Sequence, residues 1–423
     1  MLINFSVSNF ASFKDKVTLS MEKTAIQKHP EHIIDGGLIS GAAIYGANAS
    51  GKTTLLEAIS VLARFTQLES VGILNSYNSF MNKLDIPTGF EVNFISNNIK
   101  YLYRISFNST EILNEELWFS EKTKQNLIFK RWGVDKEFGK SFHDGWYKNR
   151  SFPKDITLLS KILHDGVVDN NILNKEHFIN VTLFLNAVVF FTPRTEVHVR
   201  QIYSHFRQNE FKGFLLDLLR QADVGITDIE FKVTDGFNHE QAAKDPQLAQ
   251  LIPGSAMSKQ VGDDYYIYTR ENGTIKEQML VAKHGDATFP FSKESAGTIK
   301  LFKLGFVLYS FKNYRGSRLL LLDEFDGLFH PFLSKALLKT LLSNHLGGQI
   351  IVALHNTILL SHEIWRVDEI WFTEKDESGV SRLYPLTDIN PRFDKDLEKD
   401  YINGRYGAIP FLGGEKQWQD IIR

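Results

Sequence analysis

The sequence reads AAIYGANASGKTTLLE from Ala42 to Glu57, and this stretch decides the expected fold. An apolar run, Ala42–Tyr45, is typical of a buried strand, and the pattern of Thr54–Phe65 is typical of a helix. Between them lies the pattern G-x-x-x-x-G-K-[ST] of a phosphate-binding loop, in the strand–loop–helix context that such a loop requires. The pattern is formed by Gly46, Gly51, Lys52 and Thr53.

The residue types in this loop match the chemistry of a nucleoside triphosphate with Mg²⁺. Glycines let backbone N–H groups turn inward around phosphate oxygens, and the start of the helix adds positive charge. Lys52 can reach the β- and γ-phosphates, and Thr53 can ligate Mg²⁺. We therefore expect ATP and Mg²⁺ as cofactors. The other residues expected to bind the nucleotide here are Asn48, Ser50 and Thr54, together with Gly46 and Gly51.

The composition is that of an ordinary globular protein long enough for two or three domains. The chain has 423 residues, is 43% hydrophobic and carries a formal charge of −2, so global charge gives no sign of nucleic-acid or membrane binding. It has no cysteine, which excludes disulfides and thiolate metal sites. No apolar run approaches the length of a membrane span, and the first residues do not resemble a signal peptide. We expect a cytoplasmic protein with no membrane contact.

Strand and helix patterns alternate around the phosphate loop, which predicts an α/β fold with a mostly parallel sheet. We expect three regions: a β-rich first lobe over residues 1–132, an inserted mixed helical and β region over 133–285, and a second lobe over 286–423. The first lobe is expected to contain antiparallel strands at Leu2–Ser8, Val17–Met21, Thr88–Ile95, Ile99–Asn108, Leu113–Ser120 and Leu127–Trp132. The insertion is expected to contain helices at Ile156–Leu163, Lys175–Leu185 and Thr195–Asp223, a polar loop at Asp235–Val261, and a hairpin of Asp264–Arg270 with Thr274–Lys283.

A second motif completes a nucleotide site in the last region. The apolar run Leu319–Leu322 leads directly into Asp323 and Glu324, an arrangement typical of a Walker B strand. Asp323 can hold Mg²⁺ through water, and Glu324 is placed to polarise the attacking water as a general base. The run Ile350–Leu354 ends at His355, which can contact the γ-phosphate because parallel strands end at one edge of a sheet.

One further segment, Glu294-Ser295-Ala296-Gly297-Thr298, precedes a helical pattern. By itself it predicts an N-cap at Ser295, whose exposed N–H groups can bind an anion. Its place in the chain, upstream of Asp323, adds a functional interpretation.

In this order, the phosphate loop, the Glu-Ser-x-Gly-Thr segment, the Walker B strand and the strand-end histidine resemble ABC-type ATPase heads. The branch in question includes the SMC, RecF and OLD proteins. Asn9-Phe10-Ala11-Ser12-Phe13 resembles the N-terminal element of that branch, with Ala11 where the family usually has arginine. The resemblance implies a P-loop ATPase whose ATP is held between two copies, with Ser295 and Gly297 of one copy capping the nucleotide of the other. It also implies a dimer contact at Asp326. The turn Phe191–Arg194 is our candidate for the loop that links the nucleotide to the insertion.

The chain resembles most closely the ATPase partner in two-gene bacterial phage-defence and abortive-infection systems, the RloA-like and AriA-like proteins. This resemblance is carried by Asp368–Phe372, Arg382–Tyr384 and Tyr401–Pro410. It implies a regulatory ATPase that senses a nucleic-acid or phage-protein trigger and controls a separate effector, a nuclease or toxin. After His355 we find no Toprim-like carboxylate set, so the effector is expected on another protein. The tail Tyr401–Gly414 is either a partner surface or a strap over the core.

An alternative interpretation is a RecF-like or SMC-like repair ATPase that binds DNA. Its support is a local basic segment, Lys122–Arg131, which reads KTKQNLIFKR. A charge run of this kind is also typical of a solvated strand face. A transporter ATPase subunit fits poorly, since nothing hydrophobic would anchor it.

Overall fold

The computed structural model of the chain describes residues 1–67, 69–71, 86–122, 124–140, 142, 151–166, 175–207, 209–234, 237–238, 242, 244–313, 318–343, 347–389, 396–410 and 421. The chain forms two compact units. Unit 1 comprises Met1–Thr192 and Arg315–Arg423, and unit 2 comprises Pro193–Tyr314.

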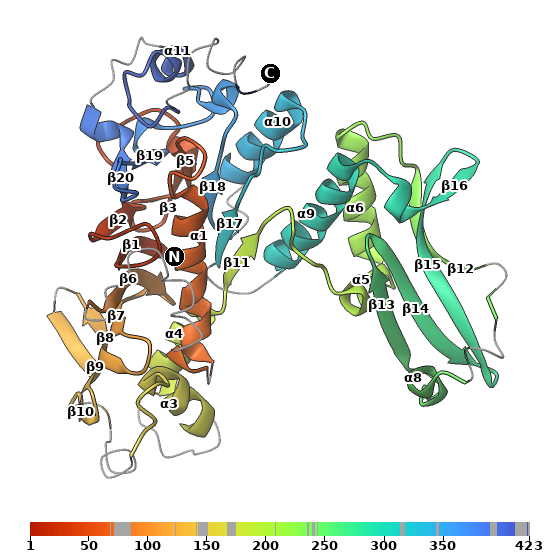
Figure 1. Cartoon of the computed structure of the whole chain (residues 1–423), viewed down its shortest axis with the longest axis horizontal. Helices are drawn as coiled ribbons and strands as arrows, with labels where there is room; N and C mark the ends of the chain where they lie inside the picture. Colours follow the sequence, from red (N-terminus) through yellow and green to blue (C-terminus); the bar gives the residue numbers. More distant parts are fainter. Residues whose placement is uncertain are drawn as a thin grey trace. The chain divides into compact units, whose positions relative to one another are not determined.

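A six-stranded sheet carries the phosphate loop in unit 1 (Figure 1). Its strands follow the order β11 (Val188–Phe191), β17 (Arg318–Leu322), β18 (Gly348–Ala353), β5 (Gly41–Tyr45), β19 (Ile370–Lys375) and β20 (Ser381–Pro385). All neighbours are parallel except β20, which runs antiparallel to β19. β5 and β17 are buried along their whole length, as strands covered on both faces should be. The carboxyl ends of β17, β18 and β5 therefore meet at one edge.

A seven-stranded antiparallel sheet forms the β-rich part of unit 1. Its order is β10 (Asp135–Phe138), β9 (Lys124–Trp132), β8 (Ile112–Glu121), β7 (Ile99–Phe107), β6 (Thr88–Ser96), β1 (Leu2–Ser8) and β2 (Val17–Ser20). β6 alternates strictly between buried and half-exposed residues, so one face packs on the core. Asn97 and Asn98, which both have positive φ, make the two-residue turn to β7.

Helices fill the space beside the two sheets of unit 1. α1 (Lys52–Ser60) continues into the 3₁₀ turn η2 (Val61–Thr66), and one apolar cluster joins α1 to residues of both sheets. Glu115 on β8 is fully buried and accepts hydrogen bonds from the first two N–H groups of α3, at 2.6 and 2.9 Å. The remaining helical elements of unit 1 are η1 (Pro30–His32), α3 (Leu158–Gly166), α4 (Lys175–Leu185), α10 (Pro331–Ser343), η4 (Thr357–Leu359), η5 (Val367–Glu369), η6 (Leu386–Ile389) and α11 (Leu397–Ile402). Strands β3 (Ile33–Ile34) and β4 (Leu38–Ile39) form a small separate sheet.

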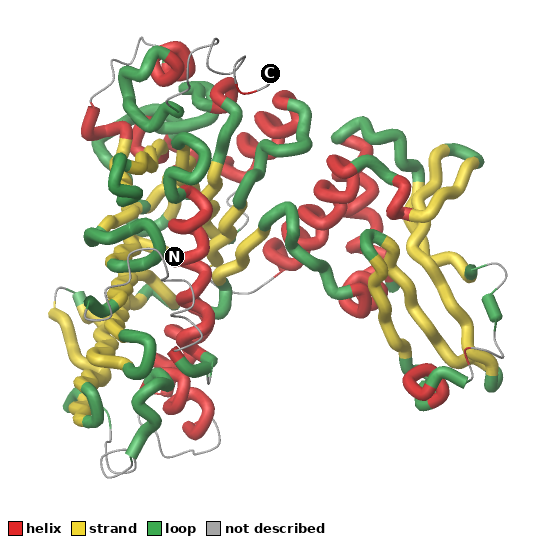
Figure 2. The backbone as a smooth tube through the Cα atoms, viewed as in Figure 1, coloured by secondary structure: helices red, strands yellow, loops and turns green. Residues whose placement is uncertain are grey.

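Unit 2 has its own sheet and helices (Figure 2). The sheet runs β12 (Asp228–Val233), β15 (Thr274–His284), β14 (Asp264–Glu271) and β13 (Ala256–Val261), with β16 (Ala287–Pro290) also pairing with β15. The helical elements are α5 (Val199–Phe206), α6 (Asn209–Gln221), α8 (Pro246–Ala249), η3 (Phe291–Lys293) and α9 (Ala296–Asn313). α9 is apolar on most sides and packs against α6, so it is the central helix of this unit.

The structure confirms the expected α/β fold and most of the expected elements. Three details were wrong. The expected polar loop Asp235–Val261 contains strand β13, the expected helix Thr195–Asp223 is two helices, and α1 begins at Lys52 rather than Thr54. Residues of α3 and α4 pack in the core of unit 1, because they cover the antiparallel sheet. The compact units thus divide at 192/193 and 314/315, whereas the regions 1–132, 133–285 and 286–423 remain a prediction.

The described part of the C-terminal tail covers the core, which favours the strap interpretation. The Tyr401 ring stacks on Phe372 at 5.5 Å and its hydroxyl donates to the Ala408 carbonyl at 3.0 Å. Tyr401, Tyr406 and Ala408 are all buried. Residues 411–414 of the predicted tail lie outside the described residues.

Candidate nucleotide-binding site

The phosphate loop follows β5 and leads into α1. Its backbone turns through conformations that only glycine adopts easily, with φ of 156° at Gly46 and 118° at Gly51. A Cβ on Gly46 would lie 2.3 Å from the Thr373 carbonyl oxygen, and one on Gly51 would lie 2.8 Å from Ser381 Oγ. The glycines therefore allow the loop to lie against β19 and β20.

Lys52 lies at the floor of the loop. Its ammonium donates to the carbonyls of Gly46 at 2.7 Å and Ala47 at 2.9 Å, and the residue is 5% exposed. Burial lowers the pKa of Lys52 from 10.5 to about 8, although the nearby Asp323 carboxylate partly opposes this. A poorly solvated cation held among backbone carbonyls is well suited to receive phosphate oxygens.

Thr53 and Asp323 bring two oxygen ligands together. The Thr53 hydroxyl donates to the Asp323 carboxylate, with Oγ1 at 3.0 Å from Oδ2 and 3.2 Å from Oδ1. Asp323 follows β17, which is separated from β5 by β18 alone. Burial raises the pKa of Asp323, and Glu324 adds to this effect. A hydroxyl and a carboxylate at this spacing fit the oxygen ligands that Mg²⁺ prefers.

Glu324 and His355 follow the ends of the neighbouring strands β17 and β18. Glu324 is exposed and has a φ of 47°, a backbone conformation that is uncommon outside glycine and often found at functional sites. His355 follows β18, and burial together with the Lys52 charge lowers its pKa. At neutral pH its ring is therefore uncharged and can offer one N–H donor.

Asp326 positions the histidine loop. Its Oδ2 accepts the backbone N–H of His355 at 2.9 Å and also that of Asn356. Asp326 is 8% exposed, so these charge-assisted bonds are shielded from water. The dimer contact that the resemblance implies at Asp326 stays a prediction, and its bonds to the histidine loop were not predicted from the sequence.

These groups surround one pocket of about 870 Å³ in unit 1. Seven of the predicted site residues line it: Asn48, Gly51, Lys52, Thr53, Thr54, Glu324 and His355. Gly46, Ser50 and Asp323 lie behind this surface and bond to its residues or to the strands that support it. The lining also contains five residues that the sequence patterns did not predict as nucleotide-site residues: Ala49, Asp326, Gly327, Asn356 and Lys375. Lys375 ends β19, and pairing that strand with β5 is the only signal that would have found it.

The N-terminal element packs against the phosphate loop. Phe10 and Phe13 exchange backbone hydrogen bonds at 2.9 Å, and Ala11 between them has a φ of 45°. Ser381 joins this turn to the loop, because its hydroxyl donates to the Ser50 carbonyl at 2.7 Å and lies 2.7 Å from Ser12 Oγ. The element that resembles a nucleotide-gripping segment is therefore adjacent to the loop, with alanine at the position where arginine was expected.

Ser295 and Gly297 belong to unit 2. Ser295 Oγ accepts the N–H of Thr298 at 3.1 Å, which confirms the predicted N-cap of α9. Ser295 is exposed, so the N-terminus of α9 is accessible to an anion. The candidate linking turn Phe191–Arg194 starts at the end of β11, where the Phe191 carbonyl accepts the N–H of Asp323 at 2.9 Å, and it continues into unit 2.

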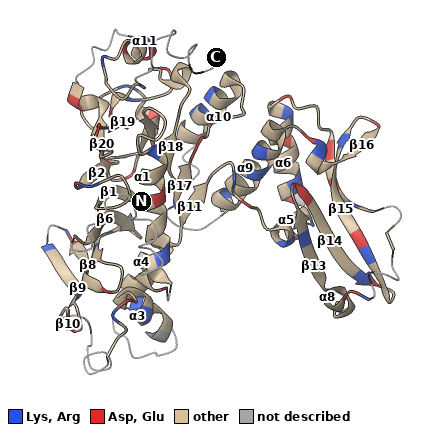
Figure 3. Cartoon of the chain, in the orientation of Figure 1, with Lys and Arg blue, Asp and Glu red and all other residues tan. Residues whose placement is uncertain are grey.

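In the basic segment Lys122–Arg131, Lys122 and Lys124 are exposed, whereas Lys130 and Arg131 on β9 have partners within the chain. Arg131 is 2% exposed and donates to the carbonyls of Gly133, Pro153 and Ile156 at 2.7–2.9 Å. Lys130 pairs with Glu116 at 3.0 Å. Lys and Arg are also scattered along the other elements of unit 1 (Figure 3).

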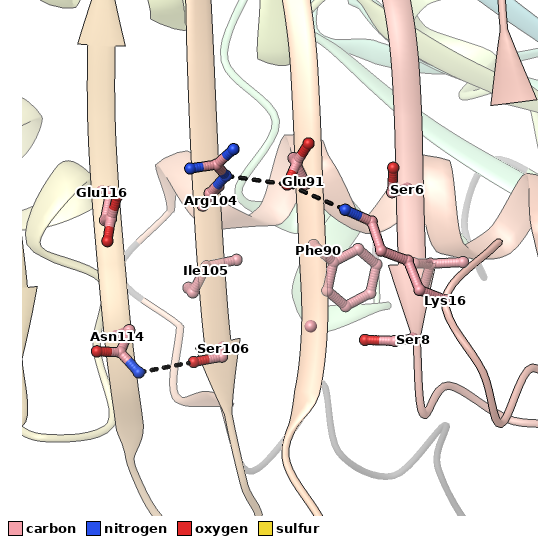
Figure 4. Close-up of a pocket in the computed structure, with 12 residues that line it drawn as sticks. Ser6, Ser8, Lys16, Phe90, Glu91, Arg104, Ile105, Ser106, Asn114 and Glu116 are labelled. Atoms are coloured by element: carbon pink, nitrogen blue, oxygen red, sulfur yellow. Dashed lines mark hydrogen bonds and ion pairs between the residues drawn. The ribbon is translucent and has the colours of Figure 1, made fainter. Parts of the chain in front are cut away.

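A second pocket, of about 420 Å³, lies on the same antiparallel sheet (Figure 4). Its two cations, Lys16 and Arg104, both bind Glu91, at 3.2 and 2.9 Å. Glu91 is shared by both cations and Glu116 also lines the pocket, so the lining carries two positive and two negative groups. Mixed charge of this kind is less favourable to a phosphate backbone than a continuous basic surface.

The sequence matches one family of known proteins. A family described as "AAA domain, putative AbiEii toxin, Type IV TA system" matches residues 42–361, which is more than half of the chain. No curated protein matches the sequence. Among the described residues, no helix is long and apolar enough to cross a membrane.

Three solved structures with similar folds are heads of SMC proteins. One is an SMC head bound to the C-terminal winged-helix domain of ScpA, at 12% identity and a TM-score of 0.46, covering 90% of this chain and 96% of that one. The SMC head domain from Thermotoga maritima has 14% identity and a TM-score of 0.37, with coverage of 91% and 98%. The head from Pyrococcus furiosus, with an extended coiled coil and bound to the C-terminal domain of ScpA, has 12% identity and a TM-score of 0.41, with coverage of 92% and 97%.

The family match starts at the strand before the phosphate loop and ends just after His355. It therefore spans every residue that lines the pocket except Lys375. On this evidence the chain belongs to the AAA domain family of the putative AbiEii toxin, type IV TA system.

Proposed function

We propose that this protein is a Mg²⁺-dependent ATPase that controls a separate effector in an anti-phage defence system. The observation that carries the catalytic part is the meeting of Lys52, Thr53, Asp323, Glu324 and His355 around one pocket. The regulatory part is supported by the family, whose description refers to a toxin of a toxin–antitoxin system.

Each residue has a distinct role in the proposed hydrolysis of ATP to ADP and phosphate. Lys52 stabilises the negative charge that develops on the transferred phosphoryl group. Thr53 and Asp323 hold Mg²⁺, which when bound neutralises charge on the β- and γ-phosphate oxygens. Glu324 accepts a proton from the attacking water, and neutral His355 donates a hydrogen bond to a γ-phosphate oxygen. Asp326 keeps His355 in position through the two backbone bonds described above.

Closure of two copies is the proposed way in which ATP acts as a signal. The capped N-terminus of α9, with Ser295 and Gly297, offers unpaired N–H groups that favour an anion. In the ABC-type arrangement this segment would complete the ATP site of a second copy. The turn after β11 gives a direct covalent connection from the neighbourhood of Asp323 to unit 2. Occupancy of the pocket would thereby be communicated to unit 2 and to an effector bound to the assembly.

The mass of the Glu324→Gln variant, measured by light scattering with and without Mg·ATP, tests this proposal. Removing the base should slow hydrolysis and preserve binding, so the variant should form a larger assembly only when ATP is present. The double variant Glu324→Gln with Ser295→Arg should remain small, because a bulky cation at the cap blocks the second site. Phosphate release should be at least about 100-fold slower than in the native protein.

Three results would overturn parts of the proposal. Normal hydrolysis by Glu324→Gln would show that another group is the base. A mass that is the same with and without ATP would remove closure as the signal. Metal-dependent cleavage of DNA or RNA by the purified chain alone would place an effector activity on this protein.

A further inference from the structure

A group of three potential metal ligands lies in unit 1 on the loop that ends in η1. His29, Glu31 and His32 each offer one ligand atom, and these atoms lie within 4.8 Å of one another. His29 Nδ1 is 2.9 Å from Glu31 Oε1, and His32 Nε2 is 3.9 Å from the same oxygen. Two imidazoles and one carboxylate are the ligand set of many zinc sites with three protein ligands.

The outer nitrogen of each ring has an acceptor that fixes its tautomer. His29 Nε2 lies 2.8 Å from the carbonyl oxygen of His362, which can only accept, so the neutral ring carries its hydrogen there. His32 Nδ1 lies 3.0–3.1 Å from both oxygens of Glu369, a fully buried carboxylate. Both inner nitrogens then present lone pairs toward Glu31. Carboxylate–histidine and carbonyl–histidine contacts of this kind are typical of the groups behind metal ligands.

The loop is held in place by a buried ionic network. Arg366, which has no exposed surface, donates to the carbonyls of Ile26 at 2.9 Å and Lys28 at 2.5 Å. It also pairs with Asp368 at 2.9 Å, and Asp368 in turn accepts the N–H of Thr24 at 2.8 Å. The position of the loop therefore does not depend on the three potential ligands themselves, as a preorganised site requires.

The backbone at His29 and the packing of the two imidazole rings are both unusual. His29 has φ 50° and ψ 61°, although it precedes Pro30, and a residue before proline normally favours an extended conformation. The two imidazole rings stack with their centroids 4.8 Å apart and their planes at 12°. In this arrangement the inner nitrogens lie within 4.8 Å of each other and of the Glu31 oxygen.

We propose that His29, Glu31 and His32 bind a zinc-class divalent cation, with Zn²⁺ as the occupant. Tetrahedral Zn²⁺ with bonds of about 2.0–2.1 Å places its ligand atoms about 3.4 Å apart, close to the distances found here. Imidazole ligands disfavour Mg²⁺ and Ca²⁺, which require oxygen. The Glu31 side chain is 48% exposed and that of His29 18%, so a fourth position opens toward water.

The proposed metal site lies beside the sheet that carries the phosphate loop. The His32 carbonyl accepts the N–H of Ser40 at 2.8 Å, directly before β5, and Glu369 directly precedes β19. The phosphate loop follows the other end of β5, so the proposed metal site takes no part in the nucleotide chemistry. Metal binding would link the three side chains of the turn 29–32, whose two rings already contact His362 and Glu369, and would thereby stabilise unit 1.

The test uses the full chain, without a polyhistidine tag, stripped with EDTA and kept in excess Mg²⁺ so that the oxygen ligands of the nucleotide site are occupied. Co²⁺ is added and followed by its visible absorption, which is intense for tetrahedral coordination. We expect saturation at one Co²⁺ per chain and loss of the signal when Zn²⁺ displaces it. Zn²⁺ should also raise the melting temperature of the protein.

Three variants make the test specific. His29→Ala with His32→Ala should abolish both the absorption and the Zn²⁺-dependent shift in melting temperature. Glu31→Gln keeps the side-chain shape at an exposed position, so it should fold normally and bind Co²⁺ at least tenfold more weakly. His198→Ala, at an exposed histidine of unit 2, should behave as the native protein.

A folded native chain that shows no tetrahedral Co²⁺ spectrum would overturn the proposal. The cluster would then be a hydrogen-bonded group that holds no cation. Unchanged binding in both Glu31→Gln and the double histidine variant would also overturn it, by locating the cation elsewhere. None of these outcomes depends on ATP hydrolysis, so they are independent of the proposed function.

Discussion

Nucleotide binding should weaken between pH 7 and pH 9, a range in which an ordinary lysine does not titrate. Burial places the pKa of Lys52 at about 8 in the free protein, and only the charged ammonium attracts phosphate. The protonated fraction then falls from about nine tenths at pH 7 to about one tenth at pH 9, so affinity should fall about tenfold. A lysine with the usual pKa of 10.5 would change it by only a few per cent. Because the pKa of Lys52 is lowered, the contribution of its ammonium to nucleotide affinity is present below about pH 8 and is lost above it.

The assay is calorimetric titration of Glu324→Gln with Mg·ATP at pH 7, 8 and 9, because slow hydrolysis permits equilibrium. Near pH 8 binding should also take up about half a proton, seen as a dependence of the measured heat on the buffer. Lys52→Arg in the same background is the control, since a guanidinium stays charged and its affinity should not vary with pH. A change of less than about twofold with Lys52 present would refute the reasoning, because it would mean that the ammonium is well solvated or does not contact phosphate.

Two further predictions concern buried carboxylates in unit 1. Asp326→Ala should lower turnover about tenfold to hundredfold, because the N–H groups of His355 and Asn356 lose their acceptor and the histidine is misplaced, while ATP affinity stays within about threefold. Steady-state phosphate release measures this, and turnover equal to the native protein would mean that the loop holds its shape without the bond. Glu115→Ala should reduce the free energy of unfolding in urea by about 2–4 kcal/mol, because two N–H groups of α3 lose a buried acceptor. Glu116→Ala, at a half-buried neighbour on β8, should cost less than about 1 kcal/mol.

Local patterns were sufficient to predict most of the fold. The apolar run before Gly46 forms a fully buried parallel strand, and the glycines adopt the positive φ that the loop motif requires. Strict alternation over residues 88–96 gave the antiparallel strand β6, because a half-buried strand must alternate. The strand β13 was missed, since Ala256–Val261 mixes polar and apolar residues on a half-exposed edge of the sheet in unit 2.

Sequence patterns also predicted the proposed catalytic residues, but not the residues whose hydrogen bonds keep those catalytic residues in position. Asp323, Glu324 and His355 follow strands whose order in the sheet places their ends together. Asp326 offers no comparable signal, because its partners are backbone N–H groups about thirty residues later that meet it only when β17 and β18 pair. Ser381 is similar, since it joins the phosphate loop to Ser12 through contacts that span more than 300 residues.

The cluster of His29, Glu31 and His32 is the clearest case of a candidate site that the sequence alone does not reveal. In the sequence, Lys28-His29-Pro30-Glu31-His32 is only a polar loop, with nothing to separate it from a solvated turn. It becomes a candidate metal site because the outer nitrogen of each ring has a hydrogen-bond partner far along the chain. The partner of His29 is the His362 carbonyl, and the partner of His32 is the Glu369 carboxylate. The inner nitrogens both face Glu31, at 2.9 Å for His29 and 3.9 Å for His32. Because the two rings share this carboxylate, a single divalent ion could take one ligand atom from each of the three residues, and only the folded chain brings these atoms within 4.8 Å of one another.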